Sequence, residues 1–267
     1  MNAKVDVLRA LRDAEHFSVS QFKTYTMCSE RYRLRYVDRA EASHRSVALV
    51  IGTAAHHGFA AYYEYLRDHG EVPPLELLTD VVADSWKQGI IGEPVVKTED
   101  PGADLDKVIG LIGAFHEGVE VPASIVGVEH AFAMAIKDPN SEEISERMLI
   151  GAIDALVTND AGELVIIEAK TAARMWPEFQ LRHDHQPTVY RKAIREGRIS
   201  QNPRLRFDFA MKTRTPTFRS VEVQRTNSDE EEMNRTFWTV LQAINAGIHF
   251  RNRGWMCSDC EFGHVCQ

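Results

Sequence analysis

Charged side chains able to do metal chemistry stand close together in the middle of this 267-residue chain. Asp154 lies within an apolar run. Glu168, fourteen residues later, and Lys170 lie at the end of a second apolar run. Because Glu168 and Lys170 are two residues apart, they share one face of a strand. Two carboxylates can hold Mg²⁺ or Mn²⁺, and a lysine beside them can orient and help deprotonate a water. The pattern predicts metal-dependent attack on a phosphodiester; the alternative is a half-buried strand whose end carries solvated charges.

The elements that must position these groups follow from the apolar spacing around them. Residues 159–162 form a turn signal, so the flanking runs are expected to pair as an antiparallel hairpin that brings Asp154 next to Glu168. Capping patterns at Ser18 and Ser228 predict the starts of helices near the two ends. A mixed central sheet flanked by helices, with a helical N-terminal part, is the α/β fold expected. The first predicted helix runs from 18 to about Cys28, with an extension to Tyr36 left open, and the other predicted helices are 52–67, 75–87, 105–118, 187–195 and 228–247. The predicted strands are 124–136, 148–158, 163–170, 204–212 and 217–224.

The chain has four cysteines, three of them in the last eleven residues. In a cytosolic chain, clustered cysteines indicate metal binding more often than disulfides. Their spacing departs from the paired Cys-x-x-Cys arrangement that is usual for zinc. The residues alone therefore leave open a structural zinc, another kind of metal site and four free thiols. The four are Cys28, Cys257, Cys260 and Cys266.

The sequence around Asp154 and Lys170 resembles the active-site core of the PD-(D/E)xK nuclease superfamily, and most closely its RecB-like branch. The first matching part is Gly151 with Asp154 three residues later. The second part, after a short turn and an apolar run, is the sequence Glu-Ala-Lys-Thr that begins at Glu168. The resemblance implies a restriction-endonuclease-like core in which Asp154 and Glu168 bind the metal ion and Lys170 serves the water. It also implies that the backbone carbonyl of Ala169 completes the metal shell.

Two further motifs match the same branch, one on each side of this core. His56 follows Gly52 by four residues, which resembles the upstream Gly-x-x-x-His element and implies that His56 is a further metal ligand. Gln186 and Tyr190 resemble the downstream Gln-x-x-x-Tyr motif. Residues four apart share a helix face, and the resemblance implies that this pair supports the site and contacts DNA. Glu129 matches an acid common in the branch and is expected to be a supporting group rather than a ligand.

The cysteines resemble those of the iron–sulfur subset of RecB-like nucleases, which includes the CRISPR-adaptation nuclease and the AddB nuclease domain. In that subset one N-terminal and three C-terminal cysteines hold a 4Fe–4S cluster, and such clusters take four thiolate ligands. The resemblance therefore implies a cysteine cluster that joins the N- and C-terminal regions, and it fits a phage-encoded protein. The chain departs from the pattern at Ser29, where a proline commonly follows the cysteine; this change removes no ligand.

Composition and charge limit the classes of partner. Aspartate and glutamate outnumber lysine and arginine by 39 to 31, and the net charge of −8 argues against a protein that coats nucleic acid through bulk charge. No stretch has the roughly 18 uncharged apolar residues of a membrane span, and the acid-containing N-terminus lacks a signal-peptide core, so a cytoplasmic protein is expected. A basic segment after Gln186 supplies candidate DNA contacts. These are Arg191, Lys192, Arg195, Lys212 and Arg214.

These expectations combine into one nuclease domain over residues 1–267. It is divided into a helical part at 18–120, a catalytic core at 124–224, and a C-terminal helix with the cysteine tail at 228–267. The resemblance implies a Mg²⁺- or Mn²⁺-dependent DNA exonuclease, acting on single-stranded or frayed DNA in recombination, repair or phage DNA metabolism. The alternatives are a nuclease that trims DNA ends for CRISPR spacer acquisition and a non-catalytic DNA-binding recombination subunit. The sequence has no helicase nucleotide-binding loop, so a helicase, a recombinase or a CRISPR integrase is the expected partner.

Overall fold

The computed structural model of this chain describes residues 15–266. Residues 1–14, which form most of the N-terminal stretch behind the cytoplasmic prediction, lie outside the described residues. Between residues 15 and 266, no helix is both long enough and apolar enough to cross a membrane. The chain divides into two compact units. The first contains the residues up to 45, residues 131–152 and those from 226 onward, and the second contains residues 46–130 and 153–225.

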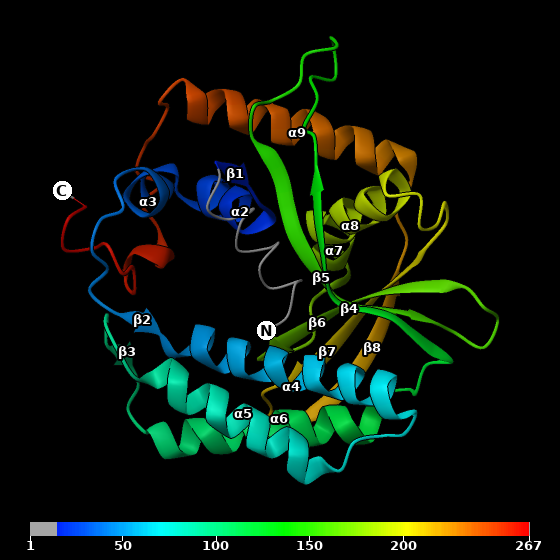
Figure 1. Cartoon of the computed structure of the whole chain (residues 1–267). Helices are drawn as coiled ribbons and strands as arrows, with labels where there is room; N and C mark the ends of the chain where they lie inside the picture. The colour runs from blue at the N-terminus through cyan, green and yellow to red at the C-terminus, as the bar shows by residue number, and fades with distance from the viewer. Residues whose placement is uncertain (1–14, 267) are drawn as a thin grey trace. The chain divides into compact units, whose positions relative to one another are not determined.

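Helices and strands follow one another along the chain as Figure 1 shows. The elements, in chain order, are β1 (His16–Phe17), α2 (Val19–Met27), α3 (Ser29–Tyr32), the π-helical turn η1 (Arg33–Val37), β2 (Arg45–Ser46), α4 (Val47–His69), α5 (Leu75–Ile90), β3 (Val96–Lys97), α6 (Pro101–Gly118), β4 (Ser124–Met134), β5 (Met148–Thr158), β6 (Leu164–Ala172), α7 (Glu178–His183), α8 (His185–Glu196), β7 (Arg204–Met211), β8 (Thr217–Val223), α9 (Asn227–Asn245) and the 3₁₀ turn η2 (Trp255–Cys257).

The second unit is built on a mixed sheet. Strand β5 pairs antiparallel with β6, β6 pairs parallel with β7, and β7 pairs antiparallel with β8. The connection from β5 to β6 is the predicted turn, closed by a hydrogen bond from the Gly162 N–H to the Asn159 carbonyl oxygen at 2.9 Å. Gly162 has the left-handed φ of +75° that side chains disfavour. The predicted hairpin is confirmed, and so is the α/β fold with a mixed central sheet flanked by helices.

One face of this sheet packs against three helices. Ile167 and Ala169 of β6 join a hydrophobic core with buried residues of α4, α5 and α6, which lie together beside the sheet in Figure 1. Within this core, the rings of Phe59 in α4 and Phe115 in α6 are 4.6 Å apart between centroids. The core thereby fixes where the polar residues of α4, including His56, lie relative to the strands.

Gly58 lets α4 approach both neighbouring helices closely. A Cβ atom there would lie 2.7 Å from side-chain atoms of both Ile112 and Val82. We therefore expect Gly58→Val to lower the free energy of unfolding by about 1–3 kcal/mol through overpacking. Gly113→Ala in α6 is the matched control, because nothing lies within 4 Å of its added Cβ and alanine favours a helix by up to about 1 kcal/mol over glycine. Urea unfolding measures both variants, and a Gly58→Val protein as stable as wild type would contradict this packing.

The other face of the sheet carries Glu168 and Lys170, because side chains alternate along β6. Phe207 and Phe209 of β7 lie directly across from these two residues in the parallel register. Tyr190 of α8 lines a small cavity together with Glu168 and Phe207. Helix α8 therefore covers the face that holds the candidate catalytic residues.

The first unit has its own aromatic core. Phe237 of α9 stacks on Phe22 of α2 with 4.4 Å between ring centroids, and it meets Phe17 of β1 edge-on at 5.7 Å. The predicted cap of α2 is confirmed, since the Ser18 hydroxyl accepts the Gln21 N–H at 3.2 Å. Strand β1 pairs in parallel with the first residues of β5.

Of the helix predictions in this unit, the end near Cys28 is confirmed and the cap at Ser228 is wrong. Helix α2 ends at Cys28, whose backbone is extended (φ −159°, ψ 107°), so the extension to residue 36 does not continue it. A short helix and a π-helical turn follow the break. The C-terminal helix α9 has Thr226 as its cap, not Ser228. Thr226 and Asp229 exchange hydrogen bonds that satisfy two backbone N–H groups, and this reciprocal pair fixes the helix start two residues earlier.

Candidate active site

Asp154 and Glu168 lie next to each other in the second unit, as the sequence predicts. Ala155 and Ile167 form one end of the paired stretch of the β5–β6 hairpin, and Asp154 and Glu168 are the residues that follow beyond it. Asp154 Oδ2 accepts a hydrogen bond from the Ala169 N–H at 2.7 Å. This bond fixes the Asp154 carboxylate against β6.

Three side chains from three elements converge at this point. His56 of α4, Glu129 of β4 and Asp154 of β5 each offer a donor atom, and these atoms lie within 4.8 Å of one another. His56 Nδ1 and Asp154 Oδ1 are 3.3 Å apart. Octahedral Mg²⁺ holds its ligands at about 2.0–2.1 Å, which places ligand atoms about 3 to 4 Å from one another. The residues present therefore fit a single divalent ion.

Glu129 reaches this group through an unusual backbone conformation. Its φ is +47° although it lies within β4. For a residue with a side chain this left-handed region costs about 1–2 kcal/mol, and residues held there cluster at functional sites. The sequence indicates a supporting role for Glu129, whereas the structure places it beside His56 and Asp154 as an equal candidate ligand.

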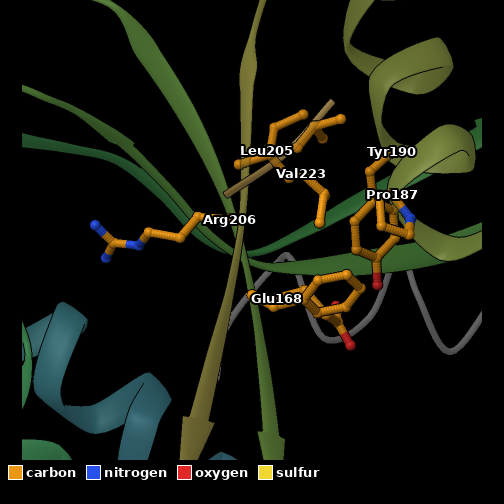
Figure 2. Close-up of a pocket in the computed structure, with 8 residues that line it drawn as sticks. Glu168, Pro187, Tyr190, Leu205, Arg206 and Val223 are labelled. Atoms are coloured by element: carbon orange, nitrogen blue, oxygen red, sulfur yellow. The ribbon is translucent and has the colours of Figure 1, made fainter. Parts of the chain in front are cut away.

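A second polar network joins Lys170, Glu168 and Gln186. Lys170 Nζ forms an ion pair with Glu168 Oε1 and donates to Gln186 Oε1 at 2.9 Å. Gln186 Nε2 donates to Glu168 Oε1 at 2.8 Å and to the Tyr190 hydroxyl at 2.7 Å. Figure 2 shows Glu168 and Tyr190 on the same side of the sheet, with Arg206 pointing away from them. The Gln-x-x-x-Tyr pair therefore holds the Glu-x-Lys pair directly.

Burial and charge set the protonation of these groups. Burial lowers the pKa of Lys170, but the Glu168 carboxylate raises it more, so the pKa lies above its ordinary value. Burial and the charge of Asp154 raise the pKa of Glu168, and Lys170 only partly offsets this. Burial lowers the pKa of His56, but the hydrogen bond and charge of Asp154 raise it more. The Glu168 carboxylate therefore favours the ammonium form of Lys170, which can hold a water or offset negative charge.

One carboxylate oxygen of this site lacks a protein partner. Glu168 Oε2 is buried and accepts no hydrogen bond from residues 15–266. An unsatisfied buried polar atom costs about 1–3 kcal/mol, and a divalent ion would remove that cost. Ligation by Glu168 Oε2 and by the Ala169 carbonyl oxygen both stay predictions.

The chain from residue 16 to residue 267 matches a family model described as the PD-(D/E)XK nuclease superfamily. The chain belongs to this superfamily. The match spans both compact units, including the candidate metal centre and all four cysteines. No curated protein matches the chain.

Among solved structures, this nuclease resembles a candidate exonuclease from Eubacterium rectale. The TM-score is 0.56 at 15% sequence identity, over 95% of this chain and 88% of the other. At that identity the likeness shows the fold alone. The structure of SSO0001 also matches, with 14% identity over 92% of this chain and 93% of the other, but its TM-score of 0.37 is too low to support an argument.

The four cysteines of this nuclease line one cavity of about 350 Å³ in the first unit. None of them forms a disulfide. Two ion pairs tie the N-terminal part to the residue after Cys260, because Arg31 and Arg35 both bind the buried carboxylate of Glu261. The predicted meeting of Cys28 with the three C-terminal cysteines is confirmed, and the bound group stays a prediction.

The predicted DNA contacts differ in their exposure. Arg191 is buried, with 9% of its surface exposed, and Lys192 pairs with Glu196 at 2.7 Å. Arg195 and Lys212 are half-buried, whereas Arg214 is exposed. Arg214 is therefore the best placed of the five to meet a phosphate, and DNA binding by the whole set stays a prediction.

Arg225 is a positioning residue that no sequence motif indicates. Its guanidinium donates to the carbonyl oxygens of Leu181 at 2.7 Å and Asp184 at 3.0 Å, and to the Thr188 hydroxyl at 3.0 Å. These bonds hold the end of α7 against the start of α8, where Gln186 lies. The acceptors are 37 to 44 residues earlier in the chain, so no local pattern could reveal them.

Two substitutions of Glu129 separate its role as a ligand from its backbone strain. We expect Glu129→Gln and Glu129→Gly both to weaken Mn²⁺ binding by at least about tenfold, since each removes a carboxylate from the donor group. In EDTA, Glu129→Gly should also be the more stable of the two by about 1 kcal/mol, because glycine adopts positive φ freely. Calorimetric titration with MnCl₂ and urea unfolding measure the two effects. The control is Glu142→Gln in an exposed loop; unchanged Mn²⁺ affinity in Glu129→Gln would exclude Glu129 as a ligand.

Proposed function

We propose that this nuclease is a RecB-like exonuclease that hydrolyses phosphodiester bonds of single-stranded or frayed DNA with Mg²⁺ or Mn²⁺. The observation that carries the proposal is the convergence of His56, Glu129 and Asp154 donor atoms within 4.8 Å, next to the Lys170–Glu168 ion pair. Carboxylate oxygens with one imidazole suit Mg²⁺ or Mn²⁺. The exonuclease name of the Eubacterium rectale protein supports the choice of an exonuclease.

His56, Glu129, Asp154 and Glu168 Oε2 would hold the divalent ion. When bound there, such an ion polarises a phosphodiester and lowers the pKa of a water at the site. These ligands come from α4, β4 and the β5–β6 hairpin. Their relative positions are therefore fixed only when the helices pack against the sheet. The folded second unit therefore preorganises the charge that the reaction needs.

Lys170 would orient the attacking water and offset the negative charge that develops on the phosphate in the transition state. Its ammonium group is held by Glu168 and by Gln186 Oε1 at 2.9 Å. Gln186 is fixed in turn by Tyr190 at 2.7 Å. Gln186 and Tyr190 thus act through Lys170 and Glu168 as positioning residues.

We further propose that the four cysteines hold a 4Fe–4S cluster, as in the iron–sulfur subset of RecB-like nucleases. A single zinc ion would lie about 2.3 Å from each of four sulfurs and needs no space beyond them. The cavity of about 350 Å³ is large enough for a multi-atom cluster. The cluster would tie the N-terminal helices to the C-terminal tail.

The setting we propose for this activity is DNA recombination, DNA repair or phage DNA metabolism. Sequence motifs of the RecB-like branch support it. Because the chain has no helicase loop, a helicase, recombinase or CRISPR integrase would supply unwinding or ends.

Cleavage of end-labelled single strands in MnCl₂ tests the activity. We expect shortening of linear strands and no cleavage of circular single strands. Asp154→Asn should slow cleavage at least about 100-fold, because a bound ion contributes several kcal/mol to the transition state. Asp160→Asn, which removes the same charge from the exposed hairpin turn, is the matched control. Equal cleavage of circular strands would exclude an exonuclease, and full activity of Asp154→Asn would exclude this metal centre.

A further inference from the structure

An exposed and acid-free segment follows helix α9 in the first unit. Residues 248–257 read Ile-His-Phe-Arg-Asn-Arg-Gly-Trp-Met-Cys, with two arginines and no acid in a protein of net charge −8. Every residue from 250 to 255 is exposed. Trp255 is 80% exposed and Phe250 is 60% exposed. Two large aromatic side chains of one ten-residue segment are therefore exposed to solvent.

The backbone of this segment is nevertheless held in place. The Tyr25 hydroxyl donates to the Ile248 carbonyl oxygen at 2.6 Å. The Phe250 N–H donates to Ser29 Oγ at 2.8 Å, and the Ser29 hydroxyl contacts the Phe250 carbonyl oxygen at 3.1 Å. The Phe250 side chain is therefore presented from a fixed main chain, which lowers the entropy cost of binding a ligand.

Neighbouring residues on both sides of Phe250 complete this attachment. The His249 ring turns inward and stacks on Tyr32 with 6.2 Å between centroids. Asn252 Nδ2 donates to the Met27 carbonyl oxygen at 2.8 Å. His249 and Asn252 therefore contact the N-terminal helices, whereas Phe250, Arg251 and Arg253 are exposed to solvent.

The arginines of this segment differ from those of the N-terminal helices. Arg31 pairs with Glu261 at 2.7 Å and Arg33 pairs with Glu30 at 2.7 Å, so their charges are neutralised. Arg251 and Arg253 form no ion pair or hydrogen bond with any residue between 15 and 266. Both guanidinium groups belong to exposed residues of the same segment as Phe250 and Trp255, and the charge of Arg251 also helps to lower the pKa of Glu30.

We propose that residues 248–257 form a binding platform for single-stranded DNA, with bases stacked on Phe250 and Trp255 and phosphates paired with Arg251 and Arg253. Aromatic faces beside free cations are the combination that binds single strands without sequence preference. The choice of DNA as the strand rests on the proposed function.

Fluorescence anisotropy with a labelled oligothymidylate in EDTA tests binding by the full chain without cleavage. We expect Trp255→Ala to weaken binding by about tenfold with an unchanged salt dependence, because a lost base stack is not a lost charge. We expect Arg253→Ala to weaken binding and to reduce the slope of log affinity against log salt by about 0.7, the value for one phosphate contact on a single strand. Trp255→Phe should retain most of the affinity.

Two matched variants serve as controls. Ile144→Ala removes an apolar side chain that is 54% exposed in an acid-rich loop, and Lys87→Ala removes an exposed cation on α5. Both should bind as wild type.

Wild-type binding by both Trp255→Ala and Arg253→Ala would overturn the platform, whatever cleavage shows. Platform-dependent binding without cleavage in any metal would instead leave the platform in place and overturn the proposed nuclease activity. Circular dichroism checks whether Trp255→Ala folds. If Trp255→Ala misfolds, the binding result for Arg253→Ala decides the test.

Discussion

Lys170→Met should cleave single-stranded DNA about 10²–10³-fold more slowly than wild type, the range for loss of one group that stabilises transition-state charge. Mn²⁺ affinity should stay close to wild type, because the ammonium group is not among the donor atoms at His56, Glu129 and Asp154. This split between binding and turnover is what distinguishes Lys170 from the proposed ligands. Single-turnover cleavage and calorimetric titration with MnCl₂ measure the two quantities on the same protein.

The same substitution should also change how stability depends on pH in EDTA. The Glu168 side chain is only 5% exposed, and burial with the charge of Asp154 already raises its pKa. Without Lys170 the pKa of Glu168 rises further, so the folded state binds its proton more tightly than the unfolded state does. The free energy of unfolding then falls as pH rises from the unfolded pKa toward the folded one, and more steeply than in wild type.

A double variant separates this structural cost from the catalytic one. Lys170→Met with Glu168→Gln removes the uncompensated buried charge, so it should recover stability and lose the added pH dependence, while cleavage stays slow. Lys87→Met on an exposed face of α5 is the control for loss of a lysine. Rapid cleavage by Lys170→Met, or recovery of cleavage in the double variant, would contradict the role given to Lys170.

The core of the candidate site could be predicted because each part depends on local order in the chain. The alternation of side chains between the two faces of β6 and the β5–β6 turn at Gly162 are enough to bring Asp154 beside Glu168. The four-residue spacing on α8 is enough to place Gln186 and Tyr190 on one helix face. The sheet and its helical layers follow from the same apolar periods. Periodicity and turn chemistry act over a few residues, so one sequence suffices to read them.

The remaining parts depend on conformations or partners that periodicity does not encode. Glu129 joins the metal centre only because its φ is +47°, and a regular strand pattern assumes negative φ throughout. The helical sequence pattern continues on both sides of Cys28, but helix α2 ends there because the backbone of Cys28 is extended. The positioning role of Arg225 could not be predicted for a different reason, since its hydrogen-bond acceptors are distant in sequence. Strain and long-range hydrogen bonds are decided by tertiary structure.

Cys28→Ser should abolish the visible charge-transfer absorption expected of an iron–sulfur protein and should lower the free energy of unfolding by about 2–5 kcal/mol. Cys28 is 229 residues before Cys257, and in the chain-entropy model a link that closes so long a loop stabilises by about 5 kcal/mol. The ion pairs of Arg31 and Arg35 with Glu261 persist and retain part of that link, so the loss should be smaller than the full value. Absorption spectra of anaerobically purified protein and urea unfolding measure the two effects.

The two readouts together decide among the three possible states of the cysteines. A coloured wild type with a colourless, destabilised Cys28→Ser supports the cluster, because the thiolate binds iron and the bound metal contributes to folding. A colourless wild type that is still destabilised by the substitution would replace the cluster by zinc and keep the link between the two ends of the chain. Unchanged colour and stability would mean that Cys28 is a free thiol. The Phe17–Phe22–Phe237 core, the Glu261 ion pairs and the hydrogen bonds between Ser29 and Phe250 would then hold the first unit together without a metal. Ser258→Ala, beside Cys257 and exposed, should leave both colour and stability unchanged in all three states.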